Sequence, residues 1–238
     1  MRISINDSNM KTKLKSFRFL IIAFQFLANL NFPQQNSLRF ENFTINNGLS
    51  NNSVNCILQT QDGFLWVATK HGLSRFDGQN FKIYKNDPNN KQSLPENYVM
   101  SLFESKDGTF WVGTWGGGLC KFNPINESFT RYDLEYTDDD YIQALFEDHQ
   151  NFIWYGTTSG GLNRLNPKTT QIIIYRPRLP AKNNFPDENI ASIDQDEKNN
   201  LWIGTWNSGL VKFNPAEQSF IQFKSNSSDK HSISNNRV

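Results

Sequence analysis

The sequence predicts an all-β protein, and three observations carry the prediction. Phe, Tyr and Trp make up 14% of the 238 residues, and aromatic side chains favour strands. The chain also contains 31 Asn residues, and Asn tolerates the positive φ of tight turns. The third observation is a pattern of roughly 45 residues that occurs four times, and a period of this length indicates a repeat architecture.

Charge and rare residues exclude several classes of function. The chain has 24 Lys and Arg against 23 Asp and Glu, for a net charge of +1. No broad basic field is therefore present to hold nucleic acid. Two Cys and three His are too few for a disulfide framework or a metal cluster. We expect no metal, no cofactor and no nucleic-acid partner in this region.

The first 33 residues read as an export signal. The stretch 19–30 is apolar and is interrupted only by Gln25 and Asn29. Four basic residues precede it: Lys11, Lys13, Lys15 and Arg18. An apolar stretch this short is typical of a signal peptide. We therefore expect a signal peptide at 1–33, with an uncleaved N-terminal anchor as the alternative, then a lead-in at 34–46 and a periplasmic or extracellular domain.

Each repeat is recognised by a tryptophan and the residues around it. A small residue follows the tryptophan at the second position, then Thr, then Gly-Leu, and then a basic residue. The four tryptophans are Trp66, Trp111, Trp154 and Trp202, and the four basic residues are Arg75, Lys121, Arg164 and Lys212. We expect the tryptophans to be structural anchors.

The repeat divides into four short strands. The first carries a small residue at its third position and ends at a turn such as Asp62-Gly63. The second contains the tryptophan, the third begins at Gly-Leu, and an Asn-Pro or similar turn leads to the fourth, which ends in an aromatic residue. Four strands per roughly 45 residues match a β-propeller blade. The predicted blades cover about 47–84, 93–132, 140–175 and 188–223; a β-sandwich with fortuitous repeats is the alternative.

A fifth blade is expected to begin near residue 232. The segment 232–238 (SISNNRV) matches the segment 93–99 (SLPENYV) that leads into the second blade. Residues 47–238 therefore read as a partial β-propeller of four blades plus the start of a fifth. Four such blades would leave an open arc, so we expect the chain to be a fragment of a seven- or eight-bladed propeller in the full-length protein.

The repeat resembles the two-component regulator propeller family over about residues 47–238. The resemblance is carried by the stretch 47–78 and by the similar stretches 111–119 (WVGTWGGGL) and 202–210 (WIGTWNSGL). In that family such repeats form the extracytoplasmic sensor region of hybrid histidine kinases, notably in Bacteroidetes, and the ligands are often oligosaccharides. The resemblance implies a membrane anchor, a histidine kinase and possible homodimerisation in the full-length receptor, all outside this chain.

Candidate ligand-binding residues lie in the loops between the second and third strands. Such loops emerge on one face of a blade and vary over a repeated scaffold, which is typical of recognition surfaces. Trp115 and Trp206 are candidates to stack on sugar rings, with packing between blades as the alternative. The candidates for hydrogen bonding are Asn207, His71, Lys70 and Ser159.

Catalysis has little support in the sequence. The four loops contain no Asp or Glu, so they display no carboxylate pair for glycoside cleavage, and we predict no catalytic residue. The predicted function is an oligosaccharide-sensing segment of a two-component receptor, with further blades and signalling domains of the same polypeptide as partners. A secreted propeller enzyme acting on polysaccharide and an extracellular interaction scaffold remain as alternatives.

Overall fold

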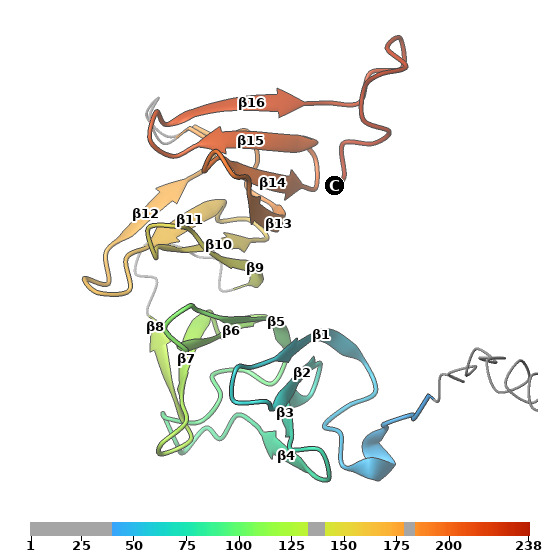
Figure 1. Cartoon of the computed structure of the whole chain (residues 1–238), viewed down its shortest axis with the longest axis vertical. Helices are drawn as coiled ribbons and strands as arrows, with labels where there is room; N and C mark the ends of the chain where they lie inside the picture. Colours follow the sequence, from blue (N-terminus) through green and yellow to red (C-terminus); the bar gives the residue numbers. More distant parts are fainter. Residues whose placement is uncertain (1–39, 133–140, 179–183) are drawn as a thin grey trace, which may run out of the picture. The chain divides into compact units, whose positions relative to one another are not determined.

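The computed structural model describes residues 40–132, 141–178 and 184–238, and in them sixteen strands form four four-stranded antiparallel sheets (Figure 1). The all-β prediction is confirmed. The described residues from Phe43 onwards belong to one compact unit, Phe43–Val238. The signal peptide predicted at 1–33 lies outside the described residues. In the described part, no helix is long and apolar enough to cross a membrane.

The four sheets follow one another along the chain, and each keeps its strands in sequence order. The first sheet contains β1 (Val54–Gln59), β2 (Leu65–Thr69), β3 (Gly72–Phe76) and β4 (Phe81–Tyr84). The second contains β5 (Val99–Glu104), β6 (Phe110–Thr114), β7 (Leu119–Asn123) and β8 (Ser128–Tyr132). The third contains β9 (Ile142–Glu147), β10 (Ile153–Thr157), β11 (Leu162–Leu165) and β12 (Ile172–Tyr175). The fourth contains β13 (Ile190–Gln195), β14 (Leu201–Thr205), β15 (Leu210–Asn214) and β16 (Ser219–Phe223).

A short 3-10 helix, η1 (Ile45–Asn47), precedes the first sheet. Thr44 caps it, because its hydroxyl oxygen accepts a hydrogen bond from the Asn46 N–H at 3.2 Å. Gly48 ends it in the left-handed region, with φ of 100°. This cap explains why the lead-in turns sharply before β1.

The first strands of successive sheets contact one another: β1 contacts β5, β5 contacts β9, and β9 contacts β13. Second strands are buried on both faces; every residue of β6 and of β10 is buried. The outermost strands, by contrast, are mostly half-buried or exposed. This gradient is expected when each sheet packs face to face between two neighbours and turns its fourth strand outward.

The repeated tryptophans form the contacts between neighbouring sheets. Trp66 stacks on Tyr84 of its own sheet at 5.6 Å between ring centroids and contacts Phe110 of the next sheet at 4.6 Å. Trp154 repeats the arrangement with Tyr175 of its own sheet and Phe213 of the next. Trp66, Trp111 and Trp154 are at most 3% exposed, whereas Trp202 is half-buried.

Small residues let the first strands approach closely. The small residue of each first strand pairs with the small residue after the tryptophan, as in Ser101 with Gly113 and Ala144 with Gly156. A Cβ added at Gly156 would lie 2.6 Å from Cβ of Ile190, the first residue of the next sheet. A Cβ added at Gly113 would lie 2.7 Å from Cγ2 of Ile142. The repeat needs a small residue there because the next sheet occupies the space.

Residues 232–238 continue the pattern beyond the fourth sheet. The Val238 N–H donates to the Thr205 carbonyl at 2.9 Å, and the Gly209 N–H donates to the Asn236 carbonyl at 2.8 Å. Gly72 makes the corresponding bond to Asn97, which precedes the second sheet. A fifth blade and a ring of seven or eight blades remain predictions.

Candidate functional site

The loops between second and third strands are held by one repeated set of hydrogen bonds. The hydroxyl of the threonine that ends each second strand donates to the carbonyl of the glycine that opens or directly precedes the third strand. These bonds join Thr69 to Gly72, Thr114 to Gly118, Thr157 to Gly161 and Thr205 to Gly209, at 2.8, 2.9, 3.3 and 2.8 Å. All four threonines are fully buried. The repeated threonine therefore fixes the loop conformation, a role that the sequence pattern did not reveal.

In the first, second and fourth units, the residue after the threonine contacts the segment that leads on from its own sheet. Lys70 places its Nζ 5.8 Å from the ring centroid of Tyr98. Trp115 contacts Tyr141 with centroids 4.7 Å apart, and the guanidinium of Arg237 lies 3.6 Å from the Trp206 ring centroid. Tyr98, Tyr141 and Arg237 each directly precede a first strand or the position where one is expected.

Lys70, Tyr98, Trp115 and Tyr141 form a continuous row, here called the aromatic row. Tyr98 stacks on Trp115 with centroids 5.8 Å apart and an interplanar angle of 27°, so it joins Lys70 to Trp115. Trp115 is 38% exposed and Tyr141 is 37% exposed. Aromatic rings that are packed on one side and open to solvent on the other can bind an apolar ligand face. Two predicted residues are thus brought together, and two tyrosines that the prediction missed complete the row.

Trp206 lies in a second, separate cluster. Its exposed fraction, 37%, is close to that of Trp115, but Arg237 covers part of its ring. The neighbouring Asn207 donates its backbone N–H to Asp187 Oδ2 at 2.9 Å. Asp187, which is 4% exposed, also accepts the Asn189 N–H at 3.0 Å. A buried carboxylate therefore fixes this loop.

The other two predicted residues contribute differently. His71 Nδ1 lies 2.9 Å from Asn51 Nδ2 in the lead-in of the first sheet, so part of its hydrogen-bonding capacity is already used. Ser159 is exposed in the loop between β10 and β11.

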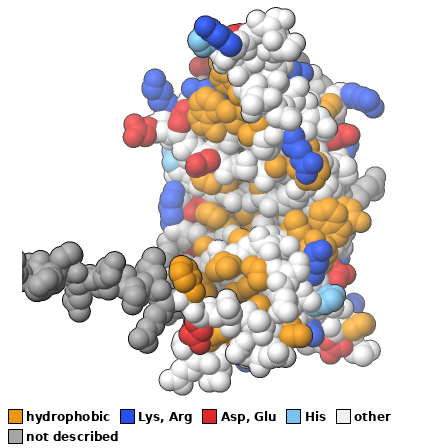
Figure 2. All heavy atoms as spheres, turned by 90° about the vertical axis from the view of Figure 1, so that its right-hand side faces the viewer, with side chains coloured by type: hydrophobic (Ala, Val, Ile, Leu, Met, Phe, Trp, Pro, Cys, Tyr) orange, Lys and Arg blue, Asp and Glu red, His pale blue; other side chains and the backbone are white. Residues whose placement is uncertain are grey.

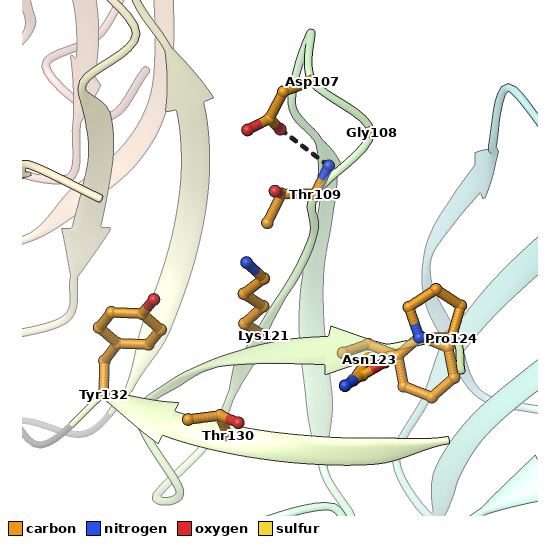
Figure 3. A pocket seen from close by; sticks show the side chains of 9 residues that line it. Asp107, Gly108, Thr109, Lys121, Asn123, Pro124, Thr130 and Tyr132 are labelled. Carbon is orange, nitrogen blue, oxygen red and sulfur yellow. Dashed lines mark hydrogen bonds between the residues drawn. The ribbon is translucent and has the colours of Figure 1, made fainter. Parts of the chain in front are cut away.

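Two hollows lie beside the turn that precedes β6, at the end of this strand opposite Trp115. These neighbouring hollows, of about 500 and 440 Å³, share Asp107, Thr109, Lys121 and Tyr132. Figure 3 shows the larger one, with the Lys121 ammonium and the Tyr132 hydroxyl pointing into the same space. The Asp107–Thr109 turn precedes β6 and Trp115 follows it, so the hollows and the aromatic row lie at opposite ends of this strand.

The visible surface carries a mixed distribution of side chains. Figure 2 shows the side that lies to the right in Figure 1, where hydrophobic side chains gather in several groups. Lys, Arg, Asp and Glu side chains are distributed between and around these groups. In the described residues, no group of three or more His, Cys, Asp or Glu is placed to hold a metal ion.

One family model matches most of the chain. The model is described as a domain of unknown function, DUF5074, and it matches residues 38–200. A curated relative, the histidine kinase P4 of Formosa agariphila, is 45% identical over 76 residues. That match spans 32% of this chain and 6% of the relative.

Solved structures with similar folds include sensor domains. The extracellular domain of the hybrid two-component system BT3049 from B. thetaiotaomicron has a TM-score of 0.69 at 27% identity, over 77% of this chain and 26% of that one. The extracellular domain of the one-component system BT4673 from the same organism has a TM-score of 0.65 at 24% identity, over 86% and 25%. Virginiamycin B lyase from Staphylococcus aureus has a TM-score of 0.56 at 16% identity, over 72% and 55%, and shows the fold alone. The chain thus spans about a quarter of the length of the two sensor domains.

Proposed function

We propose that this chain, which belongs to the DUF5074 family, is a ligand-sensing segment of the extracytoplasmic part of a two-component signalling receptor. Its similarity to the two extracellular sensor domains and to a histidine kinase supports this proposal. In the proposed receptor, further blades, a membrane anchor and a histidine kinase belong to the same polypeptide, and the receptor works as a homodimer.

The proposed ligand is an oligosaccharide that binds at the aromatic row. The observation that carries this proposal is the exposed Trp115, held between Tyr98 and Tyr141. A sugar ring presents C–H groups that pack on an aromatic face, while its hydroxyls need donors and acceptors. Lys70 is a donor at the end of the row, and His71, Ser159 and Asn207 are the further candidates for hydrogen bonds.

The mechanism of sensing follows from the contacts of the row. Tyr98 precedes β5 and Tyr141 precedes β9, so a ligand seated on Trp115 touches the entry of two successive sheets. Binding would then favour one relative arrangement of these sheets over another, and a ligand shifts such an equilibrium only by its differential affinity. The proposed output is a change in the packing between the second and third sheets.

A binding screen followed by mutation tests the proposal. An array of polysaccharide-derived oligosaccharides identifies a binding sugar, and calorimetry then measures its affinity for wild type and variants. Trp115→Ala is expected to weaken binding by about tenfold or more, because removing a contacting Trp commonly costs at least 1.4 kcal/mol. The melting temperature should stay close to that of wild type, because Trp115 is partly exposed.

Two control variants sharpen this test. Ile125→Ala removes an exposed side chain from the hairpin between β7 and β8 and should leave the affinity unchanged. Trp206→Ala removes the matching tryptophan whose ring Arg237 partly covers, and it should have a smaller effect than Trp115→Ala. Unchanged affinity in Trp115→Ala, or a loss only in Trp206→Ala, would refute the aromatic row as the site.

A further inference from the structure

A basic residue lies directly across from the tryptophan of every sheet, and one of the four behaves differently. Three of them place their charge over the tryptophan ring. Arg75 lies 5.7 Å from Trp66, Arg164 lies 5.6 Å from Trp154 and Lys212 lies 5.2 Å from Trp202. Lys121 makes no such contact with Trp111 among the described residues, and it lines the two hollows instead.

Between the first and second sheets, a carboxylate fills the space beside the basic residue. Glu127, in the hairpin between β7 and β8, accepts hydrogen bonds from Arg75 Nη2 at 3.3 Å and from the Tyr84 hydroxyl at 3.2 Å. Lys82 Nζ also bonds to it. One sheet therefore supplies two cations and a tyrosine hydroxyl, and the hairpin of the next sheet supplies the acceptor.

Between the second and third sheets, the acceptor is missing from the hairpin. The hairpins 122–128 and 165–171 align at their Asn-Pro pairs, which places Thr170 at the position of Glu127. The backbone agrees, because φ is 59° at Thr170 and 54° at Glu127. Threonine has no carboxylate, and its side chain is shorter than that of glutamate. Thr170 therefore cannot supply a carboxylate to Lys121 and Tyr132, which take the positions of Arg75 and Tyr84.

The smaller hollow occupies the corresponding space between the second and third sheets. Pro167 and Lys168 of the Thr170 hairpin line the smaller hollow together with Lys121 and Tyr132. In the described part of the chain Lys121 has no ion pair, and the Tyr132 hydroxyl has no hydrogen-bond partner. Burial raises the pKa of Tyr132, so this phenol stays protonated and can donate.

The acidic residues that line the hollows are already engaged. Asp107 Oδ1 accepts the Thr109 N–H at 2.9 Å, and Glu147 Oε2 accepts the Lys106 N–H at 2.8 Å. Hydrogen bonds from the backbone of Thr109, chiefly, and from its side chain lower the pKa of Asp107, and the charge of Lys121 lowers it further. Lys121, Lys106 and Lys168 leave a small excess of positive charge around the hollows.

We propose that the two hollows beside Lys121 and Tyr132, of which the smaller lies between the second and third sheets, bind a small hydroxylated carboxylate from solution, in the place that Glu127 takes between the first and second sheets. The carboxylate accepts hydrogen bonds from Lys121 and Tyr132, and the hydroxyl of Thr130, which lines the larger hollow, faces the hydroxyl groups of the ligand. This site is independent of the aromatic row, and its occupancy would brace the two sheets against each other.

Calorimetry with a charged and a neutral sugar tests the chemistry. Sodium D-glucuronate is the probe, D-glucose is the matched neutral control, and sodium sulfate at equal ionic strength is the anion control. Glucuronate should bind about tenfold or more tightly than glucose or sulfate, because charge-assisted hydrogen bonds to a planar carboxylate are stronger than neutral ones. Equal binding of glucose, equal binding of sulfate, or no binding of glucuronate would each overturn the proposal.

Variants at Thr170 test the position. Thr170→Glu should supply the missing carboxylate from within the chain, abolish glucuronate binding and raise the melting temperature. Thr170→Gln, which places at this position the residue found at the equivalent Gln218, should retain binding. Both changes introduce residues that the same hairpin position already carries elsewhere, so both variants should fold.

Variants at Lys121 complete the test. Lys121→Met should weaken glucuronate binding by about tenfold, whereas Lys121→Arg should retain most of it. Binding to Thr170→Glu at the wild-type affinity, or to Lys121→Met at the wild-type affinity, would place the ligand elsewhere. The surface variant Ile125→Ala, at an exposed hairpin tip that lines neither hollow, should bind glucuronate as wild type does.

Discussion

Three of the four repeated tryptophans are tied to their sheets through the indole N–H as well as the ring. The N–H of Trp111 donates to Ser105 Oγ at 2.9 Å, and the N–H of Trp154 donates to Asp148 Oδ2 at 2.7 Å. Trp202 repeats this bond with Asp196 Oδ2 at 3.1 Å. The acceptor is the residue that opens the turn before the second strand. A buried indole N–H without a partner would be costly, so this turn residue is part of the repeat although its type varies.

Gly156 supports the clearest prediction at the residue scale. Gly156→Ala adds a methyl group that would lie 2.6 Å from Cβ of Ile190. Both residues lie in strands of adjacent sheets, so neither backbone can shift easily to relieve the overlap. We expect the free energy of unfolding to fall by about 1 to 3 kcal/mol, as overpacked cores show, and urea denaturation measures it.

The double variant Ala144→Gly with Gly156→Ala locates the clash. Ala144 pairs with Gly156 inside the same sheet, so shrinking it leaves the contact with Ile190 in place. The double variant should therefore be at least as unstable as Gly156→Ala. Recovery of wild-type stability would mean that the crowding lies within the sheet and not between sheets.

At the scale of elements, the hairpin between β7 and β8 joins the first two sheets through Glu127. Lys82 is the main cause of a lowered pKa at Glu127, because its hydrogen bond and its positive charge both favour the carboxylate. A hydrogen bond from Tyr84 adds to this effect, and the pKa of Glu127 lies below its usual 4.5. A carboxylate whose pKa is lowered by folding stabilises the fold above its ordinary pKa. That contribution is lost as the pH falls through the lowered pKa.

Glu127→Gln is expected to destabilise the protein at neutral pH. The pair is partly exposed to solvent, so the loss should be roughly 0.5 to 1 kcal/mol. Urea denaturation at pH 7 and at pH 3 measures the difference between wild type and variant. The difference should shrink at the lower pH, and a difference that is the same at both pH values would contradict the role of the charge.

The candidate site was only partly predictable from the sequence, because contacts between elements complete it. Trp115 and Lys70 could be predicted because they lie in variable loops of a repeated unit. Tyr98 and Tyr141 were missed, although they stand at the same position before successive first strands. The contacts of Lys70 with Tyr98 and of Trp115 with Tyr141 run between two successive sheets, and a pattern read within one repeat does not contain them.

At the scale of the whole described molecule, the first and fourth sheets each keep one face without a neighbouring sheet. Val54 and Ile57 are 41% and 58% exposed, whereas Val99, Ile142 and Ile190, which correspond to Val54, are fully buried. On the fourth sheet, Ile221 and Phe223 are 60% and 39% exposed. Such faces tend to associate when nothing covers them.

We expect the isolated chain to self-associate through these faces at high concentration. Ile57→Lys and Ile221→Lys should each lower the average mass measured by sedimentation equilibrium, because a charge on the face opposes its burial. Ile125→Lys is the matched control, since Ile125 is 94% exposed but lies at a hairpin tip. A chain that stays monomeric, or an equal effect of Ile125→Lys, would contradict the prediction.

The sequence by itself determined the all-β class, the four-strand unit and the residues that anchor it, because these depend on local alternation, turn residues and the period of the repeat. Only the tertiary structure decided what fills the spaces between sheets: Ile190 over Gly156, Tyr141 beside Trp115, and Glu127 beside Arg75, whereas a hollow lined by Pro167 and Lys168 lies beside Lys121. Contacts within a strand pair repeat every unit, whereas contacts between sheets join non-equivalent positions of two units. One hairpin residue that differs between units therefore leaves a hollow that no single repeat predicts.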